Sequence, residues 1–238
     1  MENFDKNLKI IYLIGGIATI LVVSGIILDI IIGSSTGGNL TTLPQTAVER
    51  FVQFQQSKWF GLYNLDFLNT LVQLITIPTY LALFLAHYKN QYALSLLGLI
   101  IFLVGTIIFI TSNSALPMLE LSNKYALATS NEQKVLYAAA GEALLARGAH
   151  GSLGVFFSFL IPNIGGLVIS IAMLKGKVFS ATNSWLGILG SALLLVYVIL
   201  VTFAPSVREM ATLVAMPGGL MLLAWMIMIT IRLFSLSK

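Results

Sequence analysis

The sequence predicts an all-α integral membrane protein with six transmembrane helices and both termini in the cytoplasm. Of its 238 residues, 58% are hydrophobic and 9% are charged, whereas about a quarter of the residues in a soluble domain are charged. The mean hydropathy is +0.93, and six apolar runs reach the ~20 residues that a helix needs to cross a bilayer. The net charge of +4 comes without a dense cluster of Lys and Arg, so we expect a lipid bilayer and no nucleic acid as partner. The absence of cysteine excludes disulfides, thiolate metal ligands and a cysteine nucleophile.

The expected spans form one membrane domain that covers residues 1–238. Lys and Arg gather at the N-terminus, in the 2–3 turn, in the 4–5 turn and at the C-terminus, whereas the 5–6 turn carries Arg208 balanced by Glu209. The positive-inside rule then places both termini in the cytoplasm. The spans are expected at residues 9–33, 65–87, 93–112, 150–174, 184–204 and 211–233.

The first span is expected to stay in the protein, because its apolar run is too long for the core of a signal peptide. Gly15, Ala18 and Gly25 recur at helical spacing, and Asp29 falls in the same register. Small residues let helices approach closely. We therefore expect Asp29 to point into the bundle near its outer surface, although an interfacial Asp at the end of a span is the alternative.

The loop over residues 34–64 is expected to contain an amphipathic outer helix. Thr42 and Gln45 form a capping-box pattern, with Pro44 in the first turn. Aromatic residues follow, which favour a helix that lies on the membrane surface.

The loop over residues 113–149 is expected to form an outer helical hairpin that covers the bundle. Its arms run over residues 117–128 and 132–147, and the second arm is capped by Thr129 with Glu132 or by Ser130 with Gln133.

The second span carries the strongest functional signal. Polar residues recur at spacings of three and four, which places them on one face of a helix over ~20 Å. Such groups are costly at membrane depth and usually face protein or a water-filled cavity. Pro78 is expected to interrupt and kink this helix. The polar face comprises Asp66, Asn69, Gln73, Thr76 and Tyr80.

The remaining spans contribute packing faces and one further candidate site residue. Gly98, Gly105 and Ser112 lie seven apart in the third span and predict close packing against another helix. The fourth span contains Pro162 followed by Asn163 and two glycines, a combination that weakens a helix at mid-membrane, as in the broken helices of transporters. We therefore include Asn163 with the polar face of the second span as ligand-binding candidates, together with Asp29.

Several kinds of chemistry have little support. The two histidines, His87 and His150, are expected on opposite sides of the membrane, which excludes a multi-histidine zinc site within the chain. His150 with Glu142 and Arg147 is a secondary outer cluster of interest, but helix periodicity does not force the three together, and a solvated surface with local ion pairs is the alternative. No pattern of a phosphate loop or of a serine nucleophile elbow is present. We expect no metal and no cofactor.

Three stretches resemble a known family: residues 112–126, residues 139–146, and residues 172–179 with 185–192. They are similar to bacterial multi-pass membrane proteins grouped as "domain of unknown function 4386", and the resemblance is best over residues 112–200. It implies a prokaryotic multi-span protein of the bacterial inner membrane. It implies no activity and no site residues.

These observations favour a non-enzymatic protein that binds a small molecule or lipid in an outward-facing polar pocket. Interhelical hydrogen bonding is the alternative explanation of the polar face. A secondary transporter, a membrane-embedded enzyme with Asp29, Asp66, Glu142 and His150 converging, and a structural or interaction subunit remain open. The sequence does not predict the oligomeric state.

Overall fold

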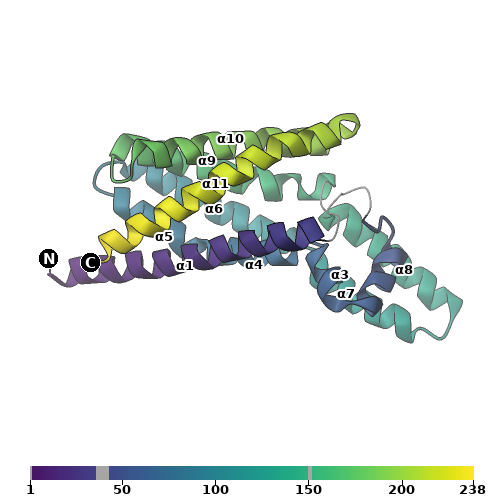
Figure 1. The fold of residues 1–238 in the computed structure, drawn as a ribbon. Helices are drawn as coiled ribbons and strands as arrows, with labels where there is room; N and C mark the ends of the chain where they lie inside the picture. The colour runs from purple at the N-terminus through teal and green to yellow at the C-terminus, as the bar shows by residue number, and fades with distance from the viewer. Residues whose placement is uncertain (1, 36–42, 150–151) are drawn as a thin grey trace.

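The computed structural model describes residues 2–35, 43–149 and 152–238, and every regular element in them is a helix. Six helices are long and apolar enough to cross a membrane, as the sequence predicts. They lie side by side along one axis, with both termini at one end and four shorter helices at the other (Figure 1). The spanning helices are α1 (Glu2–Ser35), α4 and α5 (Phe67–Ile75 and Ile77–His87, together one span), α6 (Tyr92–Ser112), α9 (Phe156–Gly176), α10 (Ala181–Phe203) and α11 (Arg208–Leu236). Short 3-10 turns at Leu153–Val155 and Pro205–Val207 precede α9 and α11.

The spanning helices pack as a closed ring. Each contacts the next in the order α6, α9, α10, α11, α1 and α4–α5, and the last pair returns to α6. In addition, α5 contacts α9 across the ring. This contact fills the half of the bundle near the termini, where the main apolar core contains Leu83, Ile169, Met173 and Ile229.

Small residues set the closest helix contacts, as expected. A Cβ at Gly98 would stand 3.0 Å from the backbone nitrogen of Ile169, and one at Gly105 would stand 2.6 Å from the ring of Pro162. Two helical turns further along α6, the hydroxyls of Ser112 and Ser158 are 2.6 Å apart. The predicted packing face of the third span is therefore confirmed, and its partner is α9.

The small face of the first span is confirmed too. A Cβ at Gly15 would lie 2.6 Å from Cβ of Ala82, and one at Gly25 would lie 2.6 Å from Val72. These contacts bring α1 against both halves of the second span.

The two prolines expected to disturb spans behave differently. The second span divides at Thr76, directly before Ile77 and Pro78, because proline supplies no N–H for the preceding turn. In contrast, α9 runs through Pro162 without a break. The expectation that the helix is interrupted in the fourth span is therefore wrong. Pro162 lies only two turns into α9, and its tight contact with Gly105 holds it in place.

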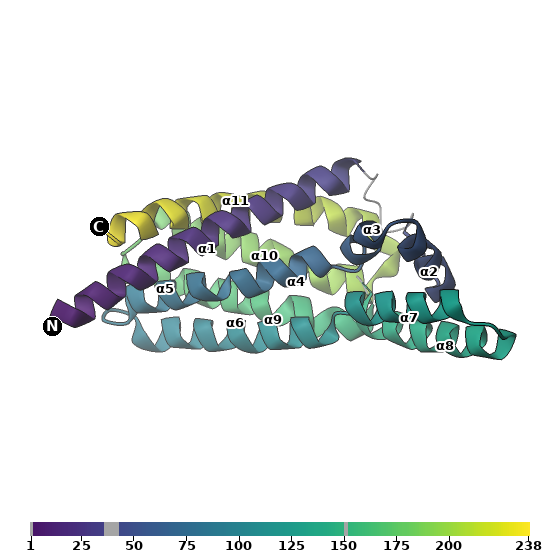
Figure 2. The ribbon, with the colours of Figure 1, turned by 90° about the horizontal axis from the view of Figure 1, so that it is seen from below.

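The four shorter helices form what we call the end cluster: α2 (Ala47–Gln56), α3 (Lys58–Tyr63), α7 (Ala115–Leu127) and α8 (Asn131–Gly148). Figure 2 shows them gathered beyond the end of the bundle that is far from the termini. The cluster has an apolar core of its own, distinct from that of the bundle. Its buried residues are Ala47, Phe51, Phe54, Leu62, Leu65, Ala115, Met118 and Leu145.

The start of α2 differs from the prediction. Its N-cap is Thr46, and the capping box pairs Thr46 with Glu49, whereas Pro44 and Gln45 precede the helix and Thr42 lies outside the described residues. The carboxylate of Glu142 in α8 accepts a 2.7 Å hydrogen bond from the backbone N–H of Ala47, which fixes the start of the helix there. In α8 the N-cap is Ser130, which accepts from Gln133, one of the two expected alternatives.

Candidate ligand cavity

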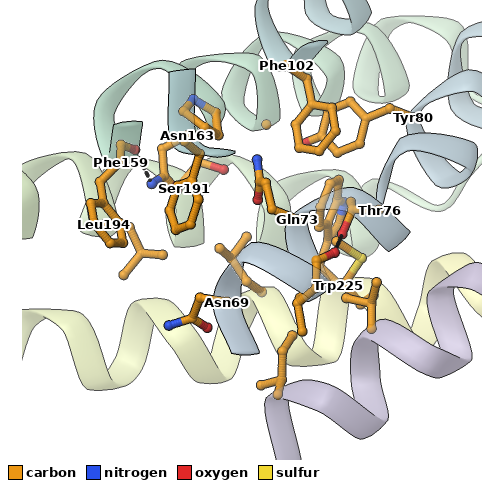
Figure 3. A pocket seen from close by; sticks show the side chains of 18 of the residues that line it. Asn69, Gln73, Thr76, Tyr80, Phe102, Phe159, Asn163, Ser191, Leu194 and Trp225 are labelled. Atoms are coloured by element: carbon orange, nitrogen blue, oxygen red, sulfur yellow. Dashed lines mark hydrogen bonds between the residues drawn. The ribbon is translucent and has the colours of Figure 1, made fainter. Parts of the chain in front are cut away.

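A cavity of about 270 Å³ lies inside the ring of spanning helices. Every spanning helix contributes to its wall, and α4, whose face carries most of the predicted polar residues, forms one side. Figure 3 shows Gln73 between Asn163 and Thr76, with Asn69 further along α4. The lining residues are Val22, Ile26, Asn69, Val72, Gln73, Thr76, Tyr80, Phe102, Phe109, Ser158, Phe159, Pro162, Asn163, Gly166, Ser191, Leu194, Leu222, Trp225 and Met226.

Two amide side chains of the wall are held by hydrogen bonds, one to a neighbouring helix and one to its own backbone. The Gln73 amide donates to the hydroxyl of Thr106 at 3.2 Å, and that hydroxyl donates to the Phe102 carbonyl at 2.9 Å. The Asn163 amide donates to the Phe159 carbonyl at 2.8 Å. These bonds use the amide nitrogens and orient both side chains.

The floor of the cavity is a stacked aromatic pair. The rings of Tyr80 and Phe102 lie parallel within 10°, with centroids 3.6 Å apart. Gly166 allows this arrangement, since a Cβ there would stand 3.1 Å from the Tyr80 hydroxyl and 2.9 Å from the hydroxyl of Ser191. The floor separates the cavity from the packed core at the end that holds the termini.

Toward the end cluster, the cavity adjoins a narrow cleft. This cleft shares Phe109, Ser158 and Phe159 with the cavity wall and extends to Asp66 and Gly148. With a volume of about 10 Å³ it has room for about one water molecule. The cavity is thus closed by packed aromatic rings at one end and bordered by a thin polar cleft at the other.

Asp66 does not belong to the helical face on which the sequence places it. Its backbone has φ of 61°, the left-handed conformation, and α4 begins one residue later. Its carboxylate accepts a 3.0 Å hydrogen bond from the Asn69 amide, so Asp66 positions Asn69 and lies outside the cavity wall. The stripe therefore starts at Asn69.

Asp66 also faces a buried arginine of the end cluster. Arg50 is 5% exposed, and its guanidinium makes two long hydrogen bonds of 3.4 Å to Gln53 and to the Asn64 carbonyl. Burial lowers the pKa of Arg50 to about 10, and the negative charge of Asp66 opposes that shift. Arg50 is therefore still charged at neutral pH, and its attraction to Asp66 ties the cluster to the start of α4.

Asp29 lies near the same end, half-buried in α1, and does not line the cavity. The Tyr63 hydroxyl donates to its backbone carbonyl at 3.1 Å. Burial, with Asp29 nearby, raises the pKa of Tyr63 well above its usual value, so the hydroxyl remains a donor. Asp29 thus takes part in a contact between α1 and α3.

The two described members of the secondary outer cluster, Glu142 and Arg147, have different partners. Glu142 binds the start of α2, whereas the guanidinium of Arg147 donates to the Thr111 carbonyl at 2.7 Å. His150 lies outside the described residues. Over the ranges 2–35, 43–149 and 152–238, no group of three or more His, Cys, Asp or Glu residues is placed to hold a metal ion.

Sequence reasoning missed several groups of the wall, among them Ser158, Ser191 and Trp225. Ser158 lies four residues before Pro162, on the same face of α9. Ser191 lies against Gly166, where a Cβ would stand 2.9 Å from its hydroxyl. Trp225 is 2% exposed, and its indole N–H has no partner among the described residues. A search for polar residues on the same helix face as Pro162 would have found Ser158.

Comparisons with models of protein families, with curated proteins and with solved structures give no match for this chain. Function must therefore be inferred from the cavity itself. Its wall has uncharged donors and acceptors together with apolar side chains, and no acidic or basic side chain of the described residues lines it.

Proposed function

We propose that this protein binds an uncharged small molecule or lipid in the central cavity and performs no chemistry on it. The observation that carries the proposal is the joint wall: all spanning helices meet at one cavity, and Asn69, Gln73, Thr76, Tyr80 and Asn163 line it. Interhelical hydrogen bonding explains Gln73, which reaches Thr106. It does not explain the cavity that these residues line together.

The wall also indicates the chemistry of the ligand. Its volume of about 270 Å³ lies just below the range of ~300–1,000 Å³ for ligand pockets. A charged ligand would meet no opposite charge there, and a charge buried without a partner is strongly unfavourable. We therefore favour a neutral molecule with a carbonyl, hydroxyl or amide that faces Gln73 and Asn163, and an apolar part that faces Ile26, Leu222 and Met226.

Native mass spectrometry of the detergent-purified protein tests the proposal. The wild type is compared with a double variant that carries Asn69→Leu and Gln73→Leu. The matched control is Gln56→Leu, which changes an exposed residue of α2 outside the cavity. We expect an additional mass on the wild type and on Gln56→Leu that the double variant lacks. Bare wild-type protein of the same thermal stability as the double variant would refute the proposal.

We infer further that the termini face the cytoplasm of a bacterial cell and that the end cluster is outside. Support comes from the charges: seven of the 13 Lys and Arg residues lie at the termini and in the short turns at that end (Figure 1), whereas acidic residues offset the six at the other end. The resemblance to the bacterial family is further support. The chain has no cysteine, so Lys124→Cys and Lys175→Cys are each unique labelling sites. Impermeant maleimide should label the first in intact cells and the second only after lysis; the reverse pattern would invert the topology.

A secondary transporter is the second candidate, favoured by the division of the second span at Thr76 beside the cavity. A transporter would have to open the floor at Tyr80 and Phe102. A single cysteine in place of Leu83, which is fully buried beyond that floor, should then react with impermeant maleimide from the side of the termini during turnover. Complete protection under all conditions would favour a binding protein.

A further inference from the structure

A second groove, of about 290 Å³, lies between the first turn of α10 and the last turns of α11. It is at the end of the bundle that holds both termini (Figure 1), and it shares no residue with the central cavity. Nothing in the proposed function uses it. Its lining residues are Phe179, Ser180, Asn183, Met228, Ile231, Arg232 and Ser235.

Asn183 is the first sign that the groove has an occupant. The residue is 1% exposed, and its Oδ1 has no hydrogen-bond partner in the part of the chain that the structure describes. Buried amides are nearly always satisfied, and Asn183 lines the groove. Because its Oδ1 is an acceptor, the missing partner has to be a donor, such as a hydroxyl of an occupant.

The other polar groups of the groove carry positive charge or donate hydrogen bonds. The Arg232 Nε donates to the Val178 carbonyl at 2.9 Å, which anchors the guanidinium and leaves its other N–H groups for a ligand. Ser180 is the N-cap of α10 and accepts from the backbone of Asn183 at 3.2 Å, so the positive end of the helix dipole also points here. Ser235, one turn beyond Arg232, adds a hydroxyl. None of the acidic side chains that the structure describes lines the groove.

The remaining wall is apolar and continues onto the lipid-facing surface. Met228 and Ile231 lie on the same face of α11 as Arg232, and Ile231 is 67% exposed. On α10, Trp185 is 50% exposed, as is typical of tryptophans at a membrane interface. The groove therefore joins a site for an anionic head to a surface for an acyl chain.

We propose that this groove binds a phosphate group, carried by an anionic phospholipid of the adjoining leaflet. The phosphate oxygens accept from Arg232 and from the first turn of α10, while a hydroxyl of the lipid headgroup donates to Oδ1 of Asn183. The acyl chain lies along Met228 and Ile231. The site is independent of the central cavity and of whatever binds there.

The test is lipid titration of the delipidated full-length protein, followed by native mass spectrometry. The probes are a phosphatidylglycerol, a diacylglycerol with the same acyl chains but no phosphate, and inorganic phosphate. Arg232→Gln is compared with Lys175→Gln, which removes one charge from an exposed position at the same end but outside the groove. Ser235→Asp, at an exposed position, adds a negative charge without disturbing the core.

We expect the wild type and Lys175→Gln to bind phosphatidylglycerol equally, and Arg232→Gln and Ser235→Asp to bind it at least about tenfold more weakly at unchanged melting temperature. Diacylglycerol should bind at least about tenfold more weakly to the wild type. Equal binding by all four proteins, or equal binding of the two lipids, would overturn the proposal. Stabilisation of the wild type by inorganic phosphate without any binding of phosphatidylglycerol would also overturn it, because the occupant would then be the free anion.

Discussion

The contact between Gly105 in α6 and Pro162 in α9 lets the packing of the cavity wall be measured with one methyl group. A Cβ at Gly105 would stand 2.6 Å from Cδ of Pro162, whereas carbon atoms pack at ~3.5–4.0 Å. The Gly105→Ala variant must therefore separate the two helices by about 1 Å. Overpacking of this kind costs ~1–3 kcal/mol.

The matched control is Gly219→Ala in α11, where a Cβ would meet no atom within 4 Å. Both changes replace a glycine inside a helix and so gain the same ~0.5–1 kcal/mol of helix propensity. Because that gain cancels, the difference between the two variants equals the packing cost, about 2 kcal/mol. For a chain of this length it corresponds to ~4–8 °C in melting temperature.

Melting of both variants in the same detergent gives that difference directly. We expect Gly219→Ala to melt slightly above the wild type and Gly105→Ala below it. Since Pro162 and Asn163 line the cavity, Gly105→Ala should also lose retained ligand. Equal melting temperatures for the two alanine variants would refute the close approach of α6 and α9 and, with it, the shape of the cavity wall.

Three further predictions concern single hydrogen bonds. Gln73→Leu should lower the free energy of unfolding by only ~0.6 kcal/mol, the average for hydrogen bonds between membrane helices, because it removes one bond to Thr106. A loss of several kcal/mol in a melting experiment would instead show that Gln73 has a structural role. Thr46→Ala should weaken the start of α2 by ~1 kcal/mol, seen as faster amide exchange confined to α2. Hydrogen bonds from the backbones of Thr46 and Gln45 lower the pKa of Glu49 below its usual value of 4.5. Its carboxylate therefore stabilises α2 above about pH 4.5. This stabilisation is lost as the pH falls through the lowered pKa of the folded state. Glu49→Gln should abolish that acid dependence, and unchanged dependence would contradict the assignment.

The bundle and the polar stripe of the second span could be predicted because they follow from periodicity alone. A helix face that repeats every three or four residues must stay together, so Asn69, Gln73, Thr76 and Tyr80 were certain to share a wall once the span was helical. The seven-residue spacing of Gly98 and Gly105 likewise required a close partner. Whether a ligand occupies the cavity does not follow from periodicity, and the binding role of these residues stays a prediction.

The errors arose where a distant residue decides the local structure. Thr42 with Gln45 and Thr46 with Glu49 both fit a capping box, and the choice between them depends on Glu142, which is 95 positions along the chain from Ala47. Asp66 has the spacing of the polar face, but its left-handed backbone removes it from the helix. Neither effect can be found from local spacing.

The separate core of the end cluster has a consequence for biosynthesis. All of its buried residues fall between Ala47 and Leu145, whereas the central cavity is incomplete until Leu222, Trp225 and Met226 of the last helix are in place. During translation, the cluster can therefore fold while the final two helices are still in the ribosome or the insertion machinery. The ligand site is the last part of the protein to be assembled, so the newly made bundle cannot enclose a molecule in the cavity before the whole chain has been inserted.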